Sequence, residues 1–235
     1  STVKNDGTIT SGINSIGIYN NQGTTTINNT AVHNIGDSGV GIYATGGLVN
    51  LNSGSAFNMG TNGAVAVYGV NSGVINSTNL NIGNSNYGYI LKGGSLTNTA
   101  GTSASMGSDS VYMYSTEGTT VTNDGTLIMS GADNVGFYMA QDPTSGVGGA
   151  VMTNNAGGNI SGTVGNNNVG IYNYGGIVDN YGTVAVGDSD ILFIAGTTDV
   201  DIQNSKYSVG IYGENATIIN RTGANISAGY GGYGI

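Results

Sequence analysis

The residues of this chain that could carry acid–base chemistry are few and scattered. Asp188 and Asp190 lie two residues apart in one turn, and Asp199 and Asp201 form a second pair of the same kind. A pair of carboxylates could act as general acid and base on a glycosidic bond. A polysaccharide-processing enzyme is therefore one open function, although no surrounding set of polar residues singles out either pair.

Nucleophilic and metal-dependent chemistry have less support. The chain has no cysteine and one histidine, His33, which we expect to be solvated or next to a turn. A nucleophilic triad needs a histidine beside the nucleophile, and zinc sites need clustered His or Cys ligands. We predict no catalytic residue, no metal site and no cofactor, so the chain is expected not to be an enzyme.

A three-residue pattern recurs along the chain: a large aliphatic residue, then any residue, then Asn. The fold that this repeat forms must position any functional site. The ten copies of the repeat begin at Val3, Ile27, Leu48, Val74, Leu96, Val121, Met152, Val178, Ile202 and Ile218. Self-similarity at 20 to 50 residues is typical of a solenoid. One repeat reads as three short strands, 27–29, 31–35 and 40–43, separated by Gly, Asn, Asp and Ser turns. We predict an all-β, right-handed parallel β-helix of about ten coils, each with three strands and about 24 residues.

Alternation along the third strand predicts which side chains face the core. Its first and third positions, as in Val40 and Ile42, are apolar and are expected to face inward. Gly41 and Tyr43, at the second and fourth positions, should then face outward. In the aliphatic-x-Asn strand the same rule turns Asn inward at a corner, where stacked amides can form a ladder.

The outward tyrosine column is the predicted binding surface. It comprises Tyr19, Tyr43, Tyr68, Tyr114, Tyr138, Tyr172 and Tyr212. A tyrosine offers a flat apolar ring and a hydroxyl group, which suits recognition. Rings roughly 5 Å apart could stack on sugars or dock a protein. The alternative is that the rings stack on one another and shield the core.

Two irregular coils interrupt the repeat. Tyr138 and Tyr172 are 34 residues apart, and the excess lies at 140–149 with the only proline. Because solenoid insertions often form binding loops, Gln141, Asp142, Pro143 and Thr144 join the candidate surface. A tolerated surface loop is the alternative. Ile194 and Tyr212 are only 18 residues apart, which predicts a shortened coil.

The turns before the third strand form another column, as in Gly36-Asp37-Ser38 and Gly187-Asp188-Ser189. Stacked oxygen ligands could hold Ca²⁺. Asp is irregular in this column, however, and the nonapeptide of calcium-binding β-rolls does not recur. We therefore predict ordinary turn chemistry.

Charge and composition limit the partners. The formal net charge is −9, and the four cations, Lys4, Lys92, Lys206 and Arg221, are scattered. Nucleic acid and anionic lipid both require clustered cations, so neither is expected as a partner. No stretch has the roughly 20 apolar residues of a membrane helix. Both ends look cut, so we expect residues 1–235 to be one β-helix segment of a longer chain.

The whole pattern resembles the passenger domain of a type V autotransporter adhesin, most of all the large fusobacterial outer-membrane adhesins. The resemblance rests on the aliphatic-x-Asn strand, the Gly-Ile-Tyr strand, the absent cysteine, the acidic composition and an N-x-G-x-I link at 5–9 and 123–127. It implies export to the cell surface, a membrane barrel outside this chain and attachment to a protein or glycan of bacteria or host cells. A passive spacer that holds a distal binding tip is the alternative.

Overall fold

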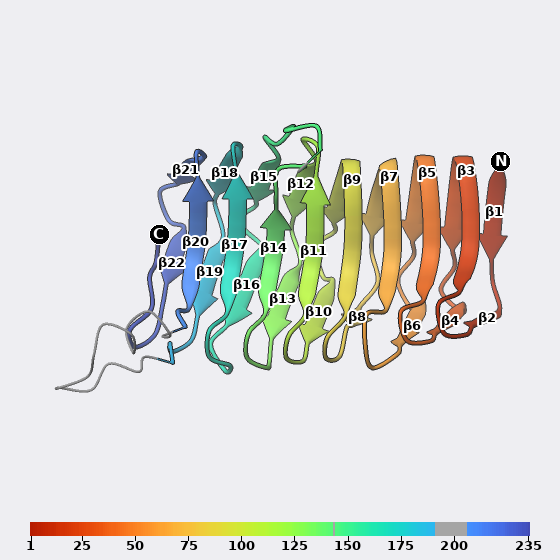
Figure 1. The fold of residues 1–235 in the computed structure, drawn as a ribbon, viewed down its shortest axis with the longest axis horizontal. Helices are drawn as coiled ribbons and strands as arrows, with labels where there is room; N and C mark the ends of the chain where they lie inside the picture. Colours follow the sequence, from red (N-terminus) through yellow and green to blue (C-terminus); the bar gives the residue numbers. More distant parts are fainter. Residues whose placement is uncertain (143, 191–205) are drawn as a thin grey trace.

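The computed structural model describes residues 1–142, 144–190 and 206–235. These residues form an all-β solenoid of about eight turns, in which parallel strands stack along one axis. Figure 1 shows the rungs side by side, with the two termini at opposite ends of the stack. The predicted parallel β-helix architecture is therefore confirmed.

Each coil contributes to three walls. The tyrosine wall faces the viewer in Figure 1 and carries the Gly-Ile-Tyr segments. The asparagine wall carries the aliphatic-x-Asn segments, and the third wall closes the coil. The four strands β3 (Ile16–Ile27), β5 (Val40–Leu51), β7 (Val65–Asn76) and β9 (Tyr87–Asn98) each run through the first two walls.

In the later coils separate strands form these walls. The tyrosine wall continues with β11 (Val111–Thr116), β14 (Val135–Met139), β17 (Val169–Tyr174) and β20 (Val209–Glu214). The asparagine wall begins with β1 (Thr2–Asn5) and continues with β12 (Thr120–Asn123), β15 (Val151–Asn154), β18 (Ile177–Asn180) and β21 (Thr217–Asn220).

The third wall consists of two sheets. One contains β2 (Thr8–Ser11), β4 (Val32–Ile35) and β6 (Ala56–Met59). The other contains β8 (Leu80–Asn81), β10 (Ser103–Met106), β13 (Thr126–Met129), β16 (Asn159–Gly162), β19 (Thr183–Val186) and β22 (Asn225–Ser227).

The sequence predicted a turn where the long strands in fact continue around a corner. In β3, β5 and β9 two consecutive residues with positive φ make this corner, for example Gly46 (φ 61°) and Gly47 (φ 126°) in β5, and in β7 only Asn71 (φ 49°) has a positive φ there. A Cβ on Gly47 would lie 2.1 Å from the carbonyl oxygen of Gly23 in the preceding rung. Only glycine therefore allows the rungs to approach at this point.

The coil count differs from the predicted ten. Tyr172 pairs directly with Tyr212, so the tyrosine wall has no additional rung between β17 and β20. The predicted shortened coil between Ile194 and Tyr212 falls largely on residues 191–205, which lie outside the described residues, as does the repeat copy at 202–204.

The predicted facing of two columns on the tyrosine wall was also wrong. First-position residues lie on the outside: Ile16 is 50% exposed, and only Val65 of this column is buried. Second-position residues face inward, because a Cβ on Gly170 would lie 2.6 Å from Val184 of the third wall. The third position, as in Ile42, is buried as predicted. Second and third positions thus both face the core, and strict alternation fails between them.

The inward-facing second position accounts for an aromatic cluster in the core. Tyr112 occupies this column, is fully buried and packs edge-on between Tyr89 and Phe137, with centroid distances of 5.3 Å. Its hydroxyl group donates a hydrogen bond to Oδ1 of Asn98, at 2.7 Å. The tyrosine thereby fills space that glycine leaves elsewhere and also pairs its polar atom, as a buried hydroxyl requires.

The predicted asparagine ladder is present. Each Nδ2 donates to Oδ1 of the next rung, at 2.8–3.3 Å, through Asn76, Asn98, Asn123, Asn154, Asn180 and Asn220. All but the last are buried. The predicted register of the repeat copies that begin at Ile27 and Leu48 is wrong. Ile27 and Leu51, and not an asparagine, occupy the ladder column in β3 and β5.

A second buried polar ladder, which the sequence reading missed, lies where the third wall meets the tyrosine wall. The backbone N–H of each residue donates to a side-chain oxygen in the next rung, at 2.8–3.2 Å, through Ala64, Asn86, Ser110, Asn134, Asn168 and Ser208. From β9 onward, the residue just before each strand of the tyrosine wall is thus Asn or Ser for a structural reason.

Removing one amide from the asparagine ladder should destabilise the solenoid. Asn123→Ala deletes a donor and an acceptor, so the buried Nδ2 of Asn98 loses its acceptor and the buried Oδ1 of Asn154 loses its donor. We expect a loss of about 3 kcal/mol in unfolding free energy, measured by urea denaturation. Asn76→Leu at the ladder's end, where β5 already has Leu51, should cost clearly less. Equal effects of the two changes would contradict the ladder's role.

The inward glycine column makes a separate prediction. In Gly136→Ala the new Cβ would lie 2.4 Å from the carbonyl oxygen of Gly170. We expect this change to lower the unfolding free energy by about 1–3 kcal/mol. Val135→Ala, at the neighbouring outward position, should cost less than that. A neutral Gly136→Ala would show that the glycine column faces outward after all.

Candidate functional site

The tyrosines of the candidate surface form two stacks on the tyrosine wall. Neighbouring rings have centroids 4.6–5.6 Å apart and lie within 8–27° of parallel. The first stack contains Tyr19, Tyr43 and Tyr68, and the second contains Tyr114, Tyr138, Tyr172 and Tyr212. We call the two stacks together the tyrosine row. Tyr19 is 60% exposed, Tyr212 is 47% exposed and the other five are half-buried.

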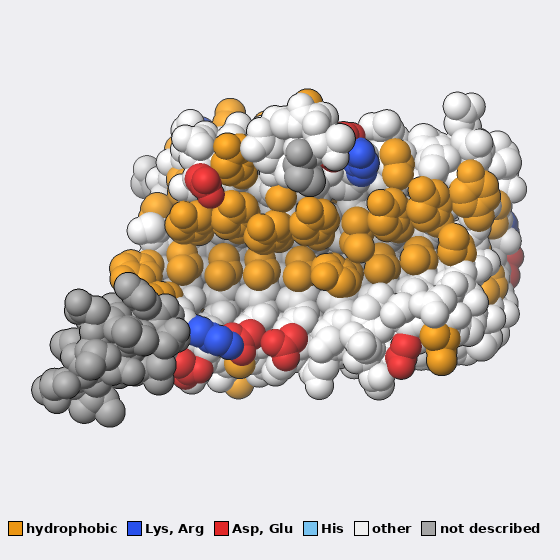
Figure 2. All heavy atoms as spheres, viewed as in Figure 1, with side chains coloured by type: hydrophobic (Ala, Val, Ile, Leu, Met, Phe, Trp, Pro, Cys, Tyr) orange, Lys and Arg blue, Asp and Glu red, His pale blue; other side chains and the backbone are white. Residues whose placement is uncertain are grey.

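A second row of apolar side chains runs beside the tyrosine row. It consists of the first-position residues Ile16, Val40, Val65, Tyr87, Val111, Val135, Val169 and Val209. Figure 2 shows two parallel lines of hydrophobic side chains along this face, with charged side chains confined to its margins. The tyrosine wall is therefore an elongated apolar surface.

The stacking decides what the tyrosine row can offer. Rings that stack along the solenoid axis cover one another's faces, so their edges and hydroxyl groups point outward. Stacking on a sugar requires a free ring face, which the interior of each stack does not provide. The predicted alternative of mutual ring stacking thus holds, and the exposed edges remain available to a protein partner.

The hydroxyl group of Tyr172 already has a hydrogen-bond partner within the chain. Its hydroxyl group donates a hydrogen bond to Oε2 of Glu214, at 3.0 Å. Burial and the adjacent carboxylate raise the pKa of Tyr172 to about 12. This hydroxyl group is therefore protonated and already paired at neutral pH.

Ile90 interrupts the tyrosine row in β9. It pairs with Tyr68 on one side and with Tyr114 on the other, so one ring face on each side is not covered by a tyrosine. Two residues later, Lys92 lies 3.3 Å from a carboxylate oxygen of Glu117 and 3.3 Å from one of Asp142. Hydrogen bonds to these two carboxylates raise the pKa of Lys92.

The same ion pair fastens the insertion to the edge of the tyrosine wall. The insertion follows β14 and precedes β15, and its described residues, 140–142 and 144–149, lie above these strands in Figure 1. Oδ1 of Asp142 accepts hydrogen bonds from the backbone N–H groups of Thr144 and Ser145, at 2.8 and 2.7 Å. These bonds lower the pKa of Asp142 to about 2. The structure thus brings the two predicted surfaces together at Lys92.

The residues of the insertion differ in what they present. Asp142 is buried, and the amide of Gln141 donates to the carbonyl oxygen of Gly146, so both hold the loop's own shape. Thr144 is exposed, and Val147 is 50% exposed. Pro143, the remaining residue of the predicted set, lies outside the described residues.

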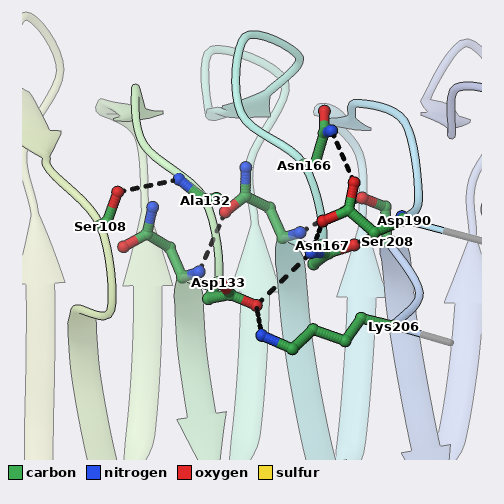
Figure 3. Close-up of polar contacts among 10 residues, drawn as sticks. Ser108, Ala132, Asp133, Asn166, Asn167, Asp190, Lys206 and Ser208 are labelled. Carbon is green, nitrogen blue, oxygen red and sulfur yellow. Dashed lines mark hydrogen bonds and ion pairs between the residues drawn. The ribbon is translucent and has the colours of Figure 1, made fainter. Parts of the chain in front are cut away.

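Asp188 and Asp190, the described pair considered for acid–base chemistry, serve structural contacts. Oδ1 of Asp188 accepts the backbone N–H of Tyr230, at 2.7 Å. Asp190 accepts hydrogen bonds from the amides of Asn167 and Asn166, at 2.7 and 2.9 Å, and these bonds lower its pKa (Figure 3). Asp199 and Asp201 lie outside the described residues.

Figure 3 also shows how Asp133 is held. Its carboxylate lies 2.9 Å from Nζ of Lys206 and within 3.5 Å of the Asn167 amide. Asn167 therefore bridges Asp133 and Asp190, which belong to the turns on either side of its own. Lys206 pairs with the charge of Asp133. The amides that bind Asp190 lower its pKa, whereas a general acid needs a raised one.

The turn column uses its oxygen atoms between coils. The backbone N–H of Thr61 donates to Asp37 at 2.6 Å, and that of Ser108 donates to Asn84 at 2.8 Å. Residues just after these positions are left-handed, for example Ser85 and Asp109. In the described ranges, three or more His, Cys, Asp or Glu side chains nowhere gather as potential metal ligands.

His33 is buried, so the prediction of a solvated histidine was wrong. It is 1% exposed, and its ring stacks on Phe57 with a centroid distance of 5.0 Å. Nε2 lies 3.1 Å from the amide nitrogen of Asn5, and Nδ1 has no partner among the described residues. The register aligns His33 with Ile9 and Phe57, an apolar column that the sequence could have revealed.

Comparisons with known proteins leave the family open. No protein-family model matches the chain, and no curated protein matches it. One solved structure with some likeness is the crystal structure of a TibC-catalyzed hyper-glycosylated TibA55-350 fragment. Its identity to this chain is 14%, the TM-score is 0.18, and the match covers 97% of this chain and 100% of that one. Such a TM-score supports no inference about fold or function. The described ranges contain no helix with the length and hydropathy of a membrane span.

His33 should make the solenoid less stable in mild acid. Burial lowers its pKa from 6.5 to about 4, so between these values the unfolded chain binds a proton that the folded chain does not. This contribution to stability is complete above pH 6.5 and is lost as the pH falls to about 4. The loss amounts to at most about 3 kcal/mol.

The measurement is urea unfolding at several pH values between 7 and 4, for the native chain and for His33→Phe. The phenylalanine keeps the stacking on Phe57 and removes the titration. We expect the unfolding free energy of the native chain to fall relative to that of His33→Phe as the pH drops from 7 to 4, because only the native chain loses the histidine contribution. Parallel pH profiles would show that His33 does not titrate in this window.

Proposed function

We propose that this chain is a segment of a cell-surface adhesin whose solenoid serves both as stalk and as contact surface. The observation that carries the proposal is the elongated apolar surface of the tyrosine wall, with two rows of outward apolar side chains. Large exposed apolar patches on soluble proteins generally mark interaction sites. The proposed location is the outside of a bacterial cell, and the proposed partner is a surface protein of another bacterium or of a host cell.

The chemistry of the tyrosine wall favours a protein partner over a glycan. Ring edges, hydroxyl groups and aliphatic side chains suit a partner with both apolar and polar contact groups. The interior ring faces are already covered, so they are not free to stack on sugars. The two rows repeat along the solenoid, so a partner could bind at several equivalent positions. Ile90 and the anchored insertion break this repetition and can fix the position at which the partner binds.

A spacer is the second candidate function, and one observation favours it. The two buried polar ladders and the ring stacks link every rung to the next, which suits a stiff extended body. A polysaccharide-processing enzyme has less support, because Asp188 and Asp190 are engaged in structural hydrogen bonds. We therefore propose that the chain is not an enzyme.

The test uses the purified chain and measures its binding to intact bacteria and host epithelial cells by flow cytometry. In the test variant, Tyr114, Tyr138 and Tyr172 are replaced by Thr, which keeps strand propensity and removes the rings. We expect the apparent affinity to fall at least about tenfold, the equivalent of about 1.4 kcal/mol. The matched control is Ile75→Thr with Ile177→Thr, which removes exposed apolar side chains from the asparagine wall.

Circular dichroism of both variants separates loss of contact from loss of fold. A chain that binds no tested cell would contradict the contact surface and favour the spacer. Undiminished binding by a folded threonine variant would place the contact elsewhere on the solenoid.

A further inference from the structure

The third wall contains a break that no other wall shows. The strands β6 and β8 belong to consecutive coils, yet they do not pair, and the third wall divides into a three-stranded and a six-stranded sheet between them. Every other pair of successive described third-wall strands is joined by a parallel ladder. Backbone N–H and C=O groups at the two facing edges are therefore left without ladder partners.

Two buried side chains keep the coils attached at both ends of the break. At one end Oγ1 of Thr78 donates to the carbonyl oxygen of Ser55, at 2.6 Å. At the other end Nδ2 of Asn86 donates to the carbonyl oxygen of Gly60, also at 2.6 Å. Both side chains are buried. The opening between them is thus a feature fixed by specific contacts at its two ends.

Two adjoining hollows occupy this break. The larger has a volume of about 320 Å³ and is lined by Ser55, Ala56, Phe57, Asn58, Asn79, Leu80, Asn81, Ser103 and Ser105. The smaller has a volume of about 220 Å³ and shares Phe57, Asn58 and Asn81 with the first. We call the two hollows together the third-wall cleft. Its lining combines amides, hydroxyl groups and buried apolar side chains, and contains no charged residue.

The outward polar ladder of the third wall stops at the cleft. On one side Asn58 donates to Asn34 at 2.8 Å, and Asn34 donates to Thr10 at 3.2 Å. Oδ1 of Asn58, which would accept from the next rung, has no hydrogen-bond partner among the described residues.

On the other side of the cleft, Oδ1 of Asn81 accepts from the Gly83 backbone N–H, at 3.3 Å, and from the Ser105 hydroxyl group. These donors fix the orientation of the amide, so Nδ2 of Asn81 faces away from them and has no partner in the described ranges. The cleft thus presents one free acceptor and one free donor from equivalent positions of two coils.

We infer that the third-wall cleft binds an uncharged saccharide. A sugar hydroxyl group both donates and accepts, so it can bridge Oδ1 of Asn58 and Nδ2 of Asn81. A simple anion has no proton for the acceptor, and a metal cation finds no carboxylate in the lining. A charged group would also be desolvated without a compensating charge.

The dimensions and the apolar lining agree with this ligand class. The larger hollow lies at the small end of the roughly 300–1,000 Å³ range of ligand pockets, which suits a short saccharide. Phe57 and Leu80, which belong to the core, contribute the apolar part of the lining of the larger hollow. The site lies on a different wall from the tyrosine row and does not depend on the proposed protein contact.

The test is titration of the ¹⁵N-labelled chain with cellobiose, maltose, lactose and chitobiose, followed by NMR. We expect at least one disaccharide to shift the side-chain amide signals of Asn58 and Asn81 and the backbone signal of Gly83, while tyrosine-wall signals stay unchanged. The double variant Asn58→Ala with Asn81→Ala should weaken this binding at least tenfold. Ser161→Ala, at the equivalent position on the paired strand β16, should leave it unchanged.

Three results would overturn the inference. One is the absence of cleft shifts with all four disaccharides at millimolar concentration. Another is equal affinity of the double variant and the native chain. The third is preferential binding of sialylated or sulfated sugars, which would show that the site selects charge. Because the proposed cell contact uses the tyrosine wall, its failure would leave these NMR results unaffected.

Discussion

From β7 onward, the register of this solenoid depends on buried asparagine amides that hydrogen-bond to their copies in the next rung. An amide carries a donor and an acceptor, so one residue type can satisfy itself indefinitely along the axis. From Asn76 to Asn220 this pairing is continuous, and its interior members are fully buried. A slip by one residue would leave each amide buried without a partner, so the ladder fixes the register of the asparagine wall.

The properties of the outer surface follow from that register. Because equivalent residues are held one rung apart, the tyrosine rings meet at 4.6–5.6 Å and stack. The same registration sets the aliphatic row beside them and produces an elongated apolar surface. Function is therefore expected where the repeat departs from regularity, at Ile90 with Lys92 and the insertion, and at the cleft between β6 and β8.

Features that repeat with the same distinctive side chain, such as Asn or Tyr, could be predicted from the sequence. Features that depend on glycine, or on pairing between distant residues, could not. The asparagine ladder, the buried third position and the partly exposed tyrosines could all be predicted from columns of like residues. The inward facing of the glycine column could not be predicted, because glycine has no side chain that prefers either the core or the solvent. Tyr112 in that column was the one available signal, since a bulky residue there had to be accommodated inside.

Other errors have similar physical causes. Ile27 and Leu51 replace asparagine in the ladder column, so the asparagines beside them give a false register in the sequence. His33 is buried because its strand pairs it with Ile9 and Phe57, and a single polar residue type does not reveal that column. The third-wall cleft left no sequence signal, because β6 and β8 have the composition of paired strands and their separation is a property of whole coils.

The most direct test of this account is the exchange of asparagine side-chain amide protons with solvent, measured by NMR in D₂O. If the ladder is continuous and buried, the Nδ2 protons of Asn98, Asn123 and Asn154 should exchange far more slowly than those of the exposed Asn29. Exchange as fast as that of Asn29 at all three positions would show that the amides are open to water. The register, and the surfaces derived from it, would then need another explanation.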